Sequence, residues 1–228
     1  IVCDAQLQTA SPVLLGPTVL SIAKTPKKVS QVGLQVVIPG RIDRRRRDYE
    51  WIAQIPKESR GKISLALVGR AQRTEDYQII EMIKDLGFIT DPELNGSYVS
   101  QSKYDVLCKK ADVIVAPVHI TFGTRTIGRD TITGVVLDAA FFGKKCLIPE
   151  GVEIDDHYRD LVVRYDSPTR LAQLINEMTW DSLDRYELSN VERIALERRA
   201  HELNRKFNQQ LLTLINQSIE VDVRKRCL

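Results

Sequence analysis

Short apolar runs and segments of helical periodicity alternate from Leu34 to Met178, and this alternation limits the possible folds more than any other feature of the sequence. The runs LQVVIP, KISLALVG, DVIVAP, KKCLIP and DLVVRY have the length and continuous apolar character of strands buried on both faces. The segments DYEWIAQI, TEDYQIIEMIKDLG, SKYDVLCKKA, TGVVLDAAFFG and SPTRLAQLINEM suit helices. Strands that alternate with helices predict an α/β fold, here a Rossmann-like parallel sheet with helices on both faces.

Capping residues mark three of the expected helix ends. Ser102 is expected to start the helix in SKYDVLCKKA. Ser167 is expected to be the N-cap of the last helix in the alternating region, with Pro168 as its first residue. Gly87 follows an amphipathic segment and is expected to close that helix.

The alternating pattern defines one domain, residues 34–180, and leaves a segment on each side of it. Residues 1–33 contain scattered Pro, Gly and Ser, which is typical of a lead-in or linker, with TVLSIA as its one strand-like run. Residues 181–228 contain a long charged stretch of helical character, so we expect a C-terminal helical extension there.

The charge balance argues against nucleic acid as a partner. The chain has 33 Lys and Arg against 30 Asp and Glu, a net charge of +3, although five arginines gather in GRIDRRRRDYEWI. A nucleic-acid-binding protein usually carries a larger and more one-sided excess of cations. No apolar run has the length of a membrane span and no signal peptide is visible. We therefore expect a cytoplasmic protein, associated with a membrane only through a partner.

The cysteines do not suggest a metal site. The four of them are widely scattered, without the CxxC or Cys/His spacing of a zinc site. Cys108 and Cys146 lie in apolar stretches and are expected to be buried, reduced thiols. We expect neither a metal nor a resident cofactor.

Functional residues are expected directly after the strands, because α/β sheets bind ligands outside the carboxyl ends of their strands. The arginine run follows LQVVIP, on a predicted strand-to-helix turn. Arginine pairs with phosphate oxygens in a bidentate manner, so one or two of these side chains could grip a diphosphate. The other interpretation is a solvated basic turn, and in either case most of the five must face water.

A second candidate is DTITGVVLD, in which Asp130 and Asp138 lie near the start of a predicted helix. If that helix begins near Thr133, Asp138 lies about one turn into it and Asp130 lies in the preceding loop. Carboxylates suit pairs of hydroxyl groups because they accept two hydrogen bonds at a fixed spacing. Two acidic residues at this spacing are also common on an ordinary protein surface.

Four segments, in order, carry a resemblance to a known family. They are VVIPGRIDRRRRDYEWI, ISLALVGRAQRTEDYQIIEMIKDLG, SYVSQSKYDVLCKKADVIVAP and DTITGVVLDAAFFGKKCLIP. From about Val36 to Met178 the chain resembles the C-terminal, donor-binding domain of GT-B glycosyltransferases, and it is most similar to the large retaining family known as glycosyltransferase group 1. The resemblance implies a nucleotide-diphospho-sugar as donor substrate, with cations in place of a metal at the diphosphate.

The resemblance also implies roles for particular residues. Arg41 and Arg46 would hold the nucleotide diphosphate and stabilise the departing group, while Arg44, Arg45 and Arg47 would be mostly solvated. Asp130 would contact the donor sugar and Asp138 the ribose. The remaining candidates are loop residues whose backbone would approach the base (Tyr98 and Val99) or the sugar and phosphate (Thr133 and Gly134).

The chain departs from the family pattern in ways that keep alternatives open. Both family glutamates are aspartate here, at Asp130 and Asp138, and the usual Gly-Phe-Gly is replaced by Thr131-Ile132-Thr133, with Gly134 displaced by one. These changes also suit a non-catalytic nucleotide-sugar-binding or scaffold domain. A sugar-nucleotide epimerase-like enzyme is a third possibility, with His119 and Glu150 as the available acid/base residues.

The resemblance covers one half of a two-domain enzyme. The acceptor, a glycan, lipid or protein, would then need an N-terminal acceptor domain or a partner subunit, and the isolated chain is expected to be inactive in transfer.

Overall fold

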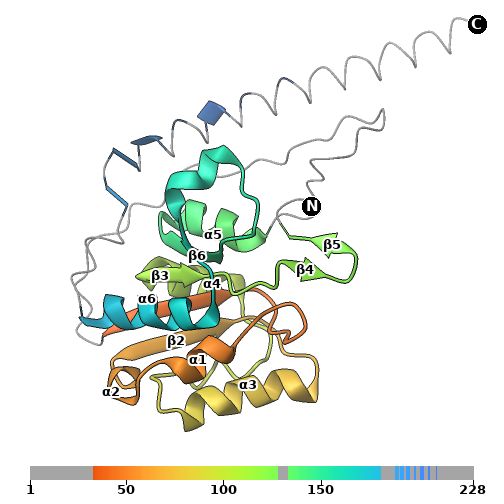
Figure 1. Ribbon diagram of the computed structural model, residues 1–228, viewed down its shortest axis with the longest axis vertical. Coiled ribbons are helices and arrows are strands. Elements are labelled where there is room, and N and C mark those ends of the chain that lie inside the picture. Colours follow the sequence, from red (N-terminus) through yellow and green to blue (C-terminus); the bar gives the residue numbers. More distant parts are fainter. Residues whose placement is uncertain are drawn as a thin grey trace, which may run out of the picture.

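The computed structural model describes residues 33–127 and 133–180, with scattered further positions between 188 and 209 (Figure 1). Five strands in these residues form a parallel sheet in the order β2-β1-β3-β6-β7. They are β1 (Leu34–Pro39), β2 (Ile63–Val68), β3 (Val113–Val115), β6 (Lys145–Pro149) and β7 (Val162–Tyr165). The predicted α/β fold with a parallel, Rossmann-like sheet is confirmed.

Ile89 adds a single bridge to the edge of β2 that faces away from β1. Its N–H donates to the Ile63 carbonyl oxygen at 3.0 Å, and its carbonyl oxygen accepts from the Leu65 N–H at 2.9 Å. Counted as a rudimentary strand, Ile89 makes the order 3-2-1-4-5-6, which is that of a Rossmann sheet. The strand order reverses between β1 and β3, so the ligand crevice of such a sheet lies at their carboxyl ends.

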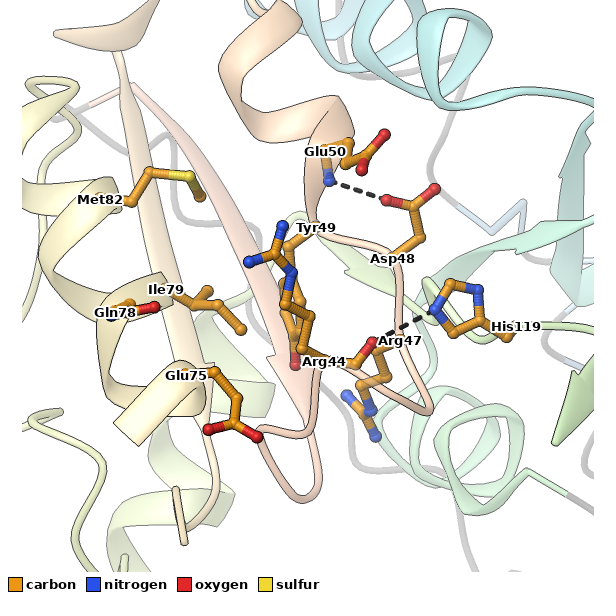
Figure 2. Close-up of a pocket in the computed structure, with 10 residues that line it drawn as sticks. All are labelled: Arg44, Arg47, Asp48, Tyr49, Glu50, Glu75, Gln78, Ile79, Met82 and His119. Carbon is orange, nitrogen blue, oxygen red and sulfur yellow. Dashed lines mark hydrogen bonds between the residues drawn. The ribbon is translucent and has the colours of Figure 1, made fainter. Parts of the chain in front are cut away.

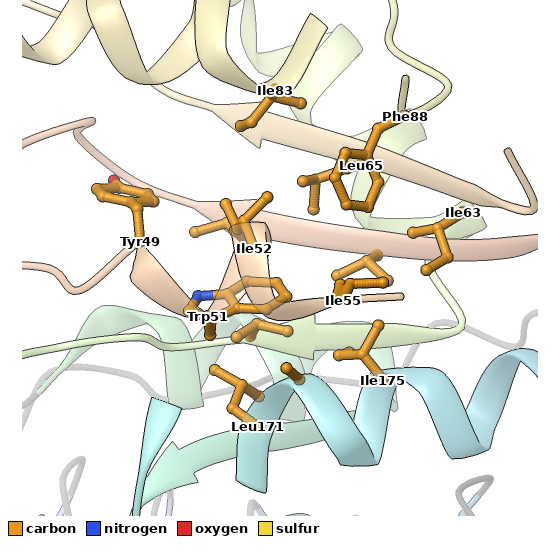
Figure 3. Close-up of a cluster of buried hydrophobic side chains, with 14 of the residues drawn as sticks. Tyr49, Trp51, Ile52, Ile55, Ile63, Leu65, Ile83, Phe88, Leu171 and Ile175 are labelled. Carbon is orange, nitrogen blue, oxygen red and sulfur yellow. The ribbon is translucent and has the colours of Figure 1, made fainter. Parts of the chain in front are cut away.

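Helices cover both faces of the sheet (Figure 1). They are α1 (Glu50–Gln54), α2 (Lys57–Arg60), α3 (Thr74–Asp85), α4 (Gln101–Lys110), α5 (Gly134–Phe142) and α6 (Pro168–Trp180), with a 3-10 helix, η1 (Asp156–Leu161). One apolar core joins the sheet to α1, α3 and α6 through Trp51, Ile83 and Leu171 (Figure 3). The other joins it to α4 and α5, and it contains the buried Cys108 and Phe142. Burial on both faces explains why the strands are continuously apolar.

The capping predictions hold at two of three positions. The Arg170 N–H donates to the Ser167 hydroxyl at 3.2 Å, and Gly87 has the positive φ of 81° that favours glycine after a helix. The prediction of Ser102 as the start of α4 is wrong. Ser100 is the N-cap, and its hydroxyl accepts from the Lys103 N–H at 3.4 Å.

Other elements have no counterpart in the sequence prediction. Besides α2 and η1, they include a hairpin of β4 (Thr121–Phe122) and β5 (Arg125–Thr126) after the carboxyl end of β3.

The strand-like run TVLSIA lies outside the described residues. In the extension, Leu188 is buried in the second core and Glu192 pairs with Lys145 at 2.7 Å. No helix in the described part of the chain is long and apolar enough to cross a membrane.

Candidate functional site

The carboxyl end of β1 continues into the arginine loop, residues 40–49, which starts with a close backbone contact. Gly40 has a φ of +91°, and a side chain added there would come within 2.6 Å of Nη2 of Arg47. Its carbonyl oxygen lies against Gly69, where an added Cβ would approach it to 2.1 Å. Glycine is therefore required at Gly40, and its missing side chain leaves room for the guanidinium of Arg47.

Two buried carboxylates fix the path of the arginine loop. Asp43 accepts from the Arg45 N–H at 3.1 Å, and its carbonyl oxygen accepts from the N–H groups of Arg46 and Arg47. Asp76, in the first turn of α3, accepts from the Arg44 N–H at 3.2 Å and the Arg73 N–H at 3.1 Å. Asp76 thereby ties the loop to the start of α3.

The loop also pairs with the chain that leaves β3. The Asp48 N–H donates to the Pro117 carbonyl oxygen at 2.7 Å, and the His119 N–H donates to the Arg46 carbonyl oxygen at 2.9 Å. The His119 ring adds a contact, because its Nε2 lies 3.3 Å from the carbonyl oxygen of Arg44 and must be the donor there. These bonds hold the arginine loop against the chain that leaves β3.

Arg47 is buried in this arrangement, with 9% of its surface exposed. Its Nη1 has no hydrogen-bond partner among the residues that the structure describes. Burial lowers the pKa of its guanidinium, yet arginine stays protonated in proteins at neutral pH. The expectation that Arg47 is solvated is wrong, because pairing of the loop with residues 117–119 turns this side chain inward.

Asp138 lies in α5 and interacts electrostatically with the guanidinium of Arg47. Burial raises the pKa of its carboxyl group, while interactions with the Tyr104 hydroxyl and with the Arg47 guanidinium oppose that rise. Burial also raises the pKa of Tyr104, and the charge of Asp138 adds to the effect. A buried cation, a half-buried carboxylate and a phenol hydroxyl therefore share one region, which suits a ligand with both an anionic part and hydroxyl groups.

Arg41 and Arg46 lie at the outside of the same loop. Arg41 is exposed and pairs with Asp43 at 3.8 Å. Arg46 is also exposed, and its guanidinium carbon lies 5.3 Å from the centre of the Phe122 ring in the hairpin. Both residues thus lie on the arginine loop, and neither guanidinium is buried as that of Arg47 is.

The other sequence candidates fall into three groups. Tyr98 is 82% exposed and Val99 is half-buried, both directly before α4. Thr133 precedes α5 and Gly134 is its first residue, so their backbone lies at the helix start. Asp130 lies outside the described residues. Within those residues, no group of His, Cys, Asp and Glu side chains has the arrangement of a metal site.

A pocket of about 290 Å³ lies between the arginine loop and α3 (Figure 2). Its lining residues are Arg44, Arg47, Asp48, Tyr49, Glu50, Glu75, Gln78, Ile79, Met82 and His119. Figure 2 shows the Arg44 guanidinium extending toward Tyr49 and Glu50, whereas that of Arg47 points the opposite way. The guanidiniums of these two arginines therefore point to opposite sides of the loop (Figure 2).

Sequence reasoning missed the residues that shape the site, namely Arg47, Tyr104, Asp43 and Asp76. For two of them a signal was present. Asp76 stands three residues after Arg73 at a helix start, where a carboxylate is a common partner for free N–H groups. Tyr104 stands one turn after Ser100 on the face of α4 that is partly buried.

A parallel Rossmann-like sheet with its crevice between β1 and β3 is the fold of one half of a GT-B glycosyltransferase. Solved structures of this class match the chain. One is HepE of Anabaena in complex with UDP and glucose, with a TM-score of 0.50 and 17% identity over 80% of this chain and 49% of that one. Another is α,α-trehalose 6-phosphate synthase from Burkholderia multivorans, with a TM-score of 0.51 and 14% identity over 82% and 44%.

A third match is sucrose-phosphate synthase from Thermosynechococcus elongatus, with a TM-score of 0.50 and 17% identity over 83% of this chain and 46% of that one. No protein-family profile and no curated protein sequence matches the chain. The resemblance to GT-B glycosyltransferases is confirmed at the level of the fold, and the chain spans about half the length of these proteins.

Proposed function

We propose that this chain is the donor-binding half of a glycosyltransferase and that it binds a nucleotide-diphospho-sugar in the crevice between β1 and β3. The observation that carries the proposal is the buried guanidinium of Arg47, whose Nη1 has no partner in the described part of the chain. A buried charge that lacks part of its hydrogen bonds is costly, by up to several kcal/mol. An arriving diphosphate would offset that cost with charge-assisted hydrogen bonds.

The remaining parts of the donor would find their partners in other residues of the chain. Asp138, next to the Tyr104 hydroxyl, would accept hydrogen bonds from the ribose hydroxyl groups. The backbone before α4, at Tyr98 and Val99, would meet the base. Thr133 and Gly134 would bring the start of α5, where N–H groups lack helical partners, to the phosphates or the sugar.

Transfer would depend on stabilising the charge that develops on the departing diphosphate. Arg47 would do so from inside the protein, where a fixed charge acts in a low dielectric. Arg41 and Arg46 would add weaker, solvent-exposed contributions from the outside of the loop. In this proposal no metal is needed at the diphosphate. Asp130 keeps its proposed contact with the donor sugar, and the acceptor domain would be a second domain or a partner subunit.

Calorimetric titration against UDP, GDP, ADP and their sugars tests the proposal. We expect one of these nucleotides or nucleotide sugars to bind, and the complex to melt at a higher temperature because the ligand binds only the native state. A hundredfold excess over the dissociation constant adds about 2.7 kcal/mol to the free energy of unfolding. If no compound of the panel binds or shifts the melting temperature, the donor site does not exist.

A further inference from the structure

The pocket between the arginine loop and α3 is not accounted for by donor binding. Arg47 contributes to its wall, but the guanidinium of that residue points to the other side of the loop (Figure 2). The pocket nevertheless opens at the carboxyl edge of the sheet, since His119 follows β3 and Arg44 follows β1. That edge is where ligands of such sheets bind.

The chemistry of the lining decides which ligand fits. Three carboxylates line the pocket, those of Asp48, Glu50 and Glu75, against the guanidinium of Arg44. Within the described residues Arg44 forms no ion pair, and the nearest cation to Glu75 is Arg73 at 4.0 Å. An excess of carboxylates repels phosphates and carboxylic acids, so an anionic ligand is disfavoured here.

Hydroxyl groups suit this lining better than charges do. Carboxylates, the Gln78 amide and a guanidinium are planar groups that form paired hydrogen bonds with neighbouring hydroxyls. Ile79 and Met82, on α3, supply an apolar surface for the C–H face of a ring. A volume of about 290 Å³ is close to the lower end of small-molecule sites, roughly 300–1,000 Å³, so it suits one ring rather than a chain.

We infer that this pocket binds a single neutral or amino-bearing carbohydrate ring. Its hydroxyl or ammonium groups bond to Glu75 and Gln78, and its C–H face lies on Ile79 and Met82. The position beside the donor crevice makes the ring an acceptor-side saccharide. That label rests on the proposed function, whereas saccharide binding itself does not.

NMR titration of the full chain tests the inference, with methyl glucoside, glucosamine and glucose 6-phosphate as probes. We expect methyl glucoside and glucosamine to change the chemical shifts of the backbone amides of residues 75–82. Glucose 6-phosphate should bind at least tenfold more weakly than either. Glu75→Gln keeps the size of the side chain and removes its charge, so glucosamine should bind about tenfold more weakly to this variant. Glu81→Gln, the same change on α3 but outside the pocket, should leave binding unaltered.

Three results overturn the inference. The first is that glucose 6-phosphate binds as tightly as the other two probes or more tightly. The second is that Glu81→Gln loses as much affinity for glucosamine as Glu75→Gln does. The third is that no probe changes any chemical shift up to about 100 mM, a concentration that corresponds to negligible affinity. Nucleotide binding should be the same in Glu75→Gln and in the unaltered chain. Saccharide binding by a chain that binds no nucleotide supports the pocket and removes only its acceptor-side label.

Discussion

At the scale of single residues, Arg47 stands out, because burial of its charged side chain does not favour the stability of the fold. Its neighbours Arg41, Arg44, Arg45 and Arg46 are exposed, where a cation is well hydrated. Arg47 is buried beside Gly40, and its Nη1 has no partner in the described residues. A buried charge that lacks part of its hydrogen bonds is costly, so an apolar side chain of similar volume is expected to be tolerated at this position. The proposed ligand binding therefore requires a cation at position 47, whereas the stability of the fold favours an apolar side chain there.

The variant Arg47→Met distinguishes the effect of this side chain on ligand binding from its effect on stability. We expect the variant to bind the nucleoside diphosphate about ten- to a hundredfold more weakly, which corresponds to a lost charge-assisted interaction of about 1.5–3 kcal/mol. The melting temperature of the ligand-free variant should be equal to that of the unaltered chain or higher. Calorimetry and thermal melting measure the two quantities on the same sample.

Arg45→Met is the matched control, because Arg45 is an exposed neighbour on the same loop. It should change nucleotide binding little, since exposed charges interact weakly through water. Arg41→Ala and Arg46→Ala should each weaken binding, by less than Arg47→Met. A destabilised Arg47→Met chain that still binds nucleotide would show that Arg47 has a structural role instead.

Asp138 gives a prediction about pH. Burial raises the pKa of its carboxyl group in the folded chain, so the folded state holds this proton more tightly than the unfolded state does. A group of this kind stabilises the fold below its unfolded pKa of about 3.9, and that contribution is lost as the pH rises through the folded pKa. At neutral pH the ionised carboxylate therefore lowers stability.

Asp138→Asn should accordingly raise the free energy of unfolding at pH 7, and the difference should shrink as the pH is lowered toward about 4. The same variant should bind nucleotide more weakly, because an amide presents one neutral acceptor oxygen to a diol, whereas a carboxylate presents two charged ones. Urea unfolding at several pH values measures the first effect. Asp85→Asn, on the exposed end of α3, is the control and should show no such pH-dependent gain.

At the scale of elements, α3 holds the arginine loop in place through one side chain. Asp76 is fully buried and accepts backbone N–H groups both from the loop and from its own helix start. We expect Asp76→Ala to lower the free energy of unfolding by about 2–4 kcal/mol, because buried N–H groups lose their acceptor. Nucleotide affinity should fall as well, since Arg47 depends on the loop for its position.

Asp85→Ala removes an exposed carboxylate from the other end of the same helix and should change neither quantity by much. Chemical denaturation and calorimetry on the two variants make the comparison. An Asp76→Ala chain that is destabilised but binds nucleotide with unaltered affinity would mean that the loop keeps its shape without this tie.

The elements themselves were largely predictable from the sequence, because their signals are local. Buried parallel strands are apolar runs, and α3 repeats its apolar residues with helical spacing. The start of α4 was missed by two residues, since Ser100 and Ser102 are equally good caps by type and only the fold selects one. The burial of Arg47 was not predictable. Five arginines look alike in sequence, and long-range bonds to Pro117 and His119 decide which of them turns inward.

At the scale of the whole molecule, the chain corresponds to about half of the glycosyltransferases whose fold it shares. The proposed crevice would hold the donor, while positioning of the acceptor needs a second wall. We therefore expect the chain alone to bind nucleotide-sugar and to transfer no sugar to an acceptor, because the two reactants are not held together. A radiolabelled-donor assay with glycan, lipid and protein acceptors measures this. Efficient transfer by the chain alone would show that it completes its own acceptor site.

The strand β7 stands at the end of the sheet order opposite β2, and it is only four residues long. Arg164 is exposed on it, and its guanidinium donates to the carbonyl oxygens of Glu150 at 2.6 Å and Val152 at 2.9 Å. Long, flat, apolar edge strands invite pairing between molecules, and natural sheets avoid this with short edges and positive side chains. The short length of β7 and the positive charge of Arg164 therefore fit the way in which natural sheets limit pairing at an edge.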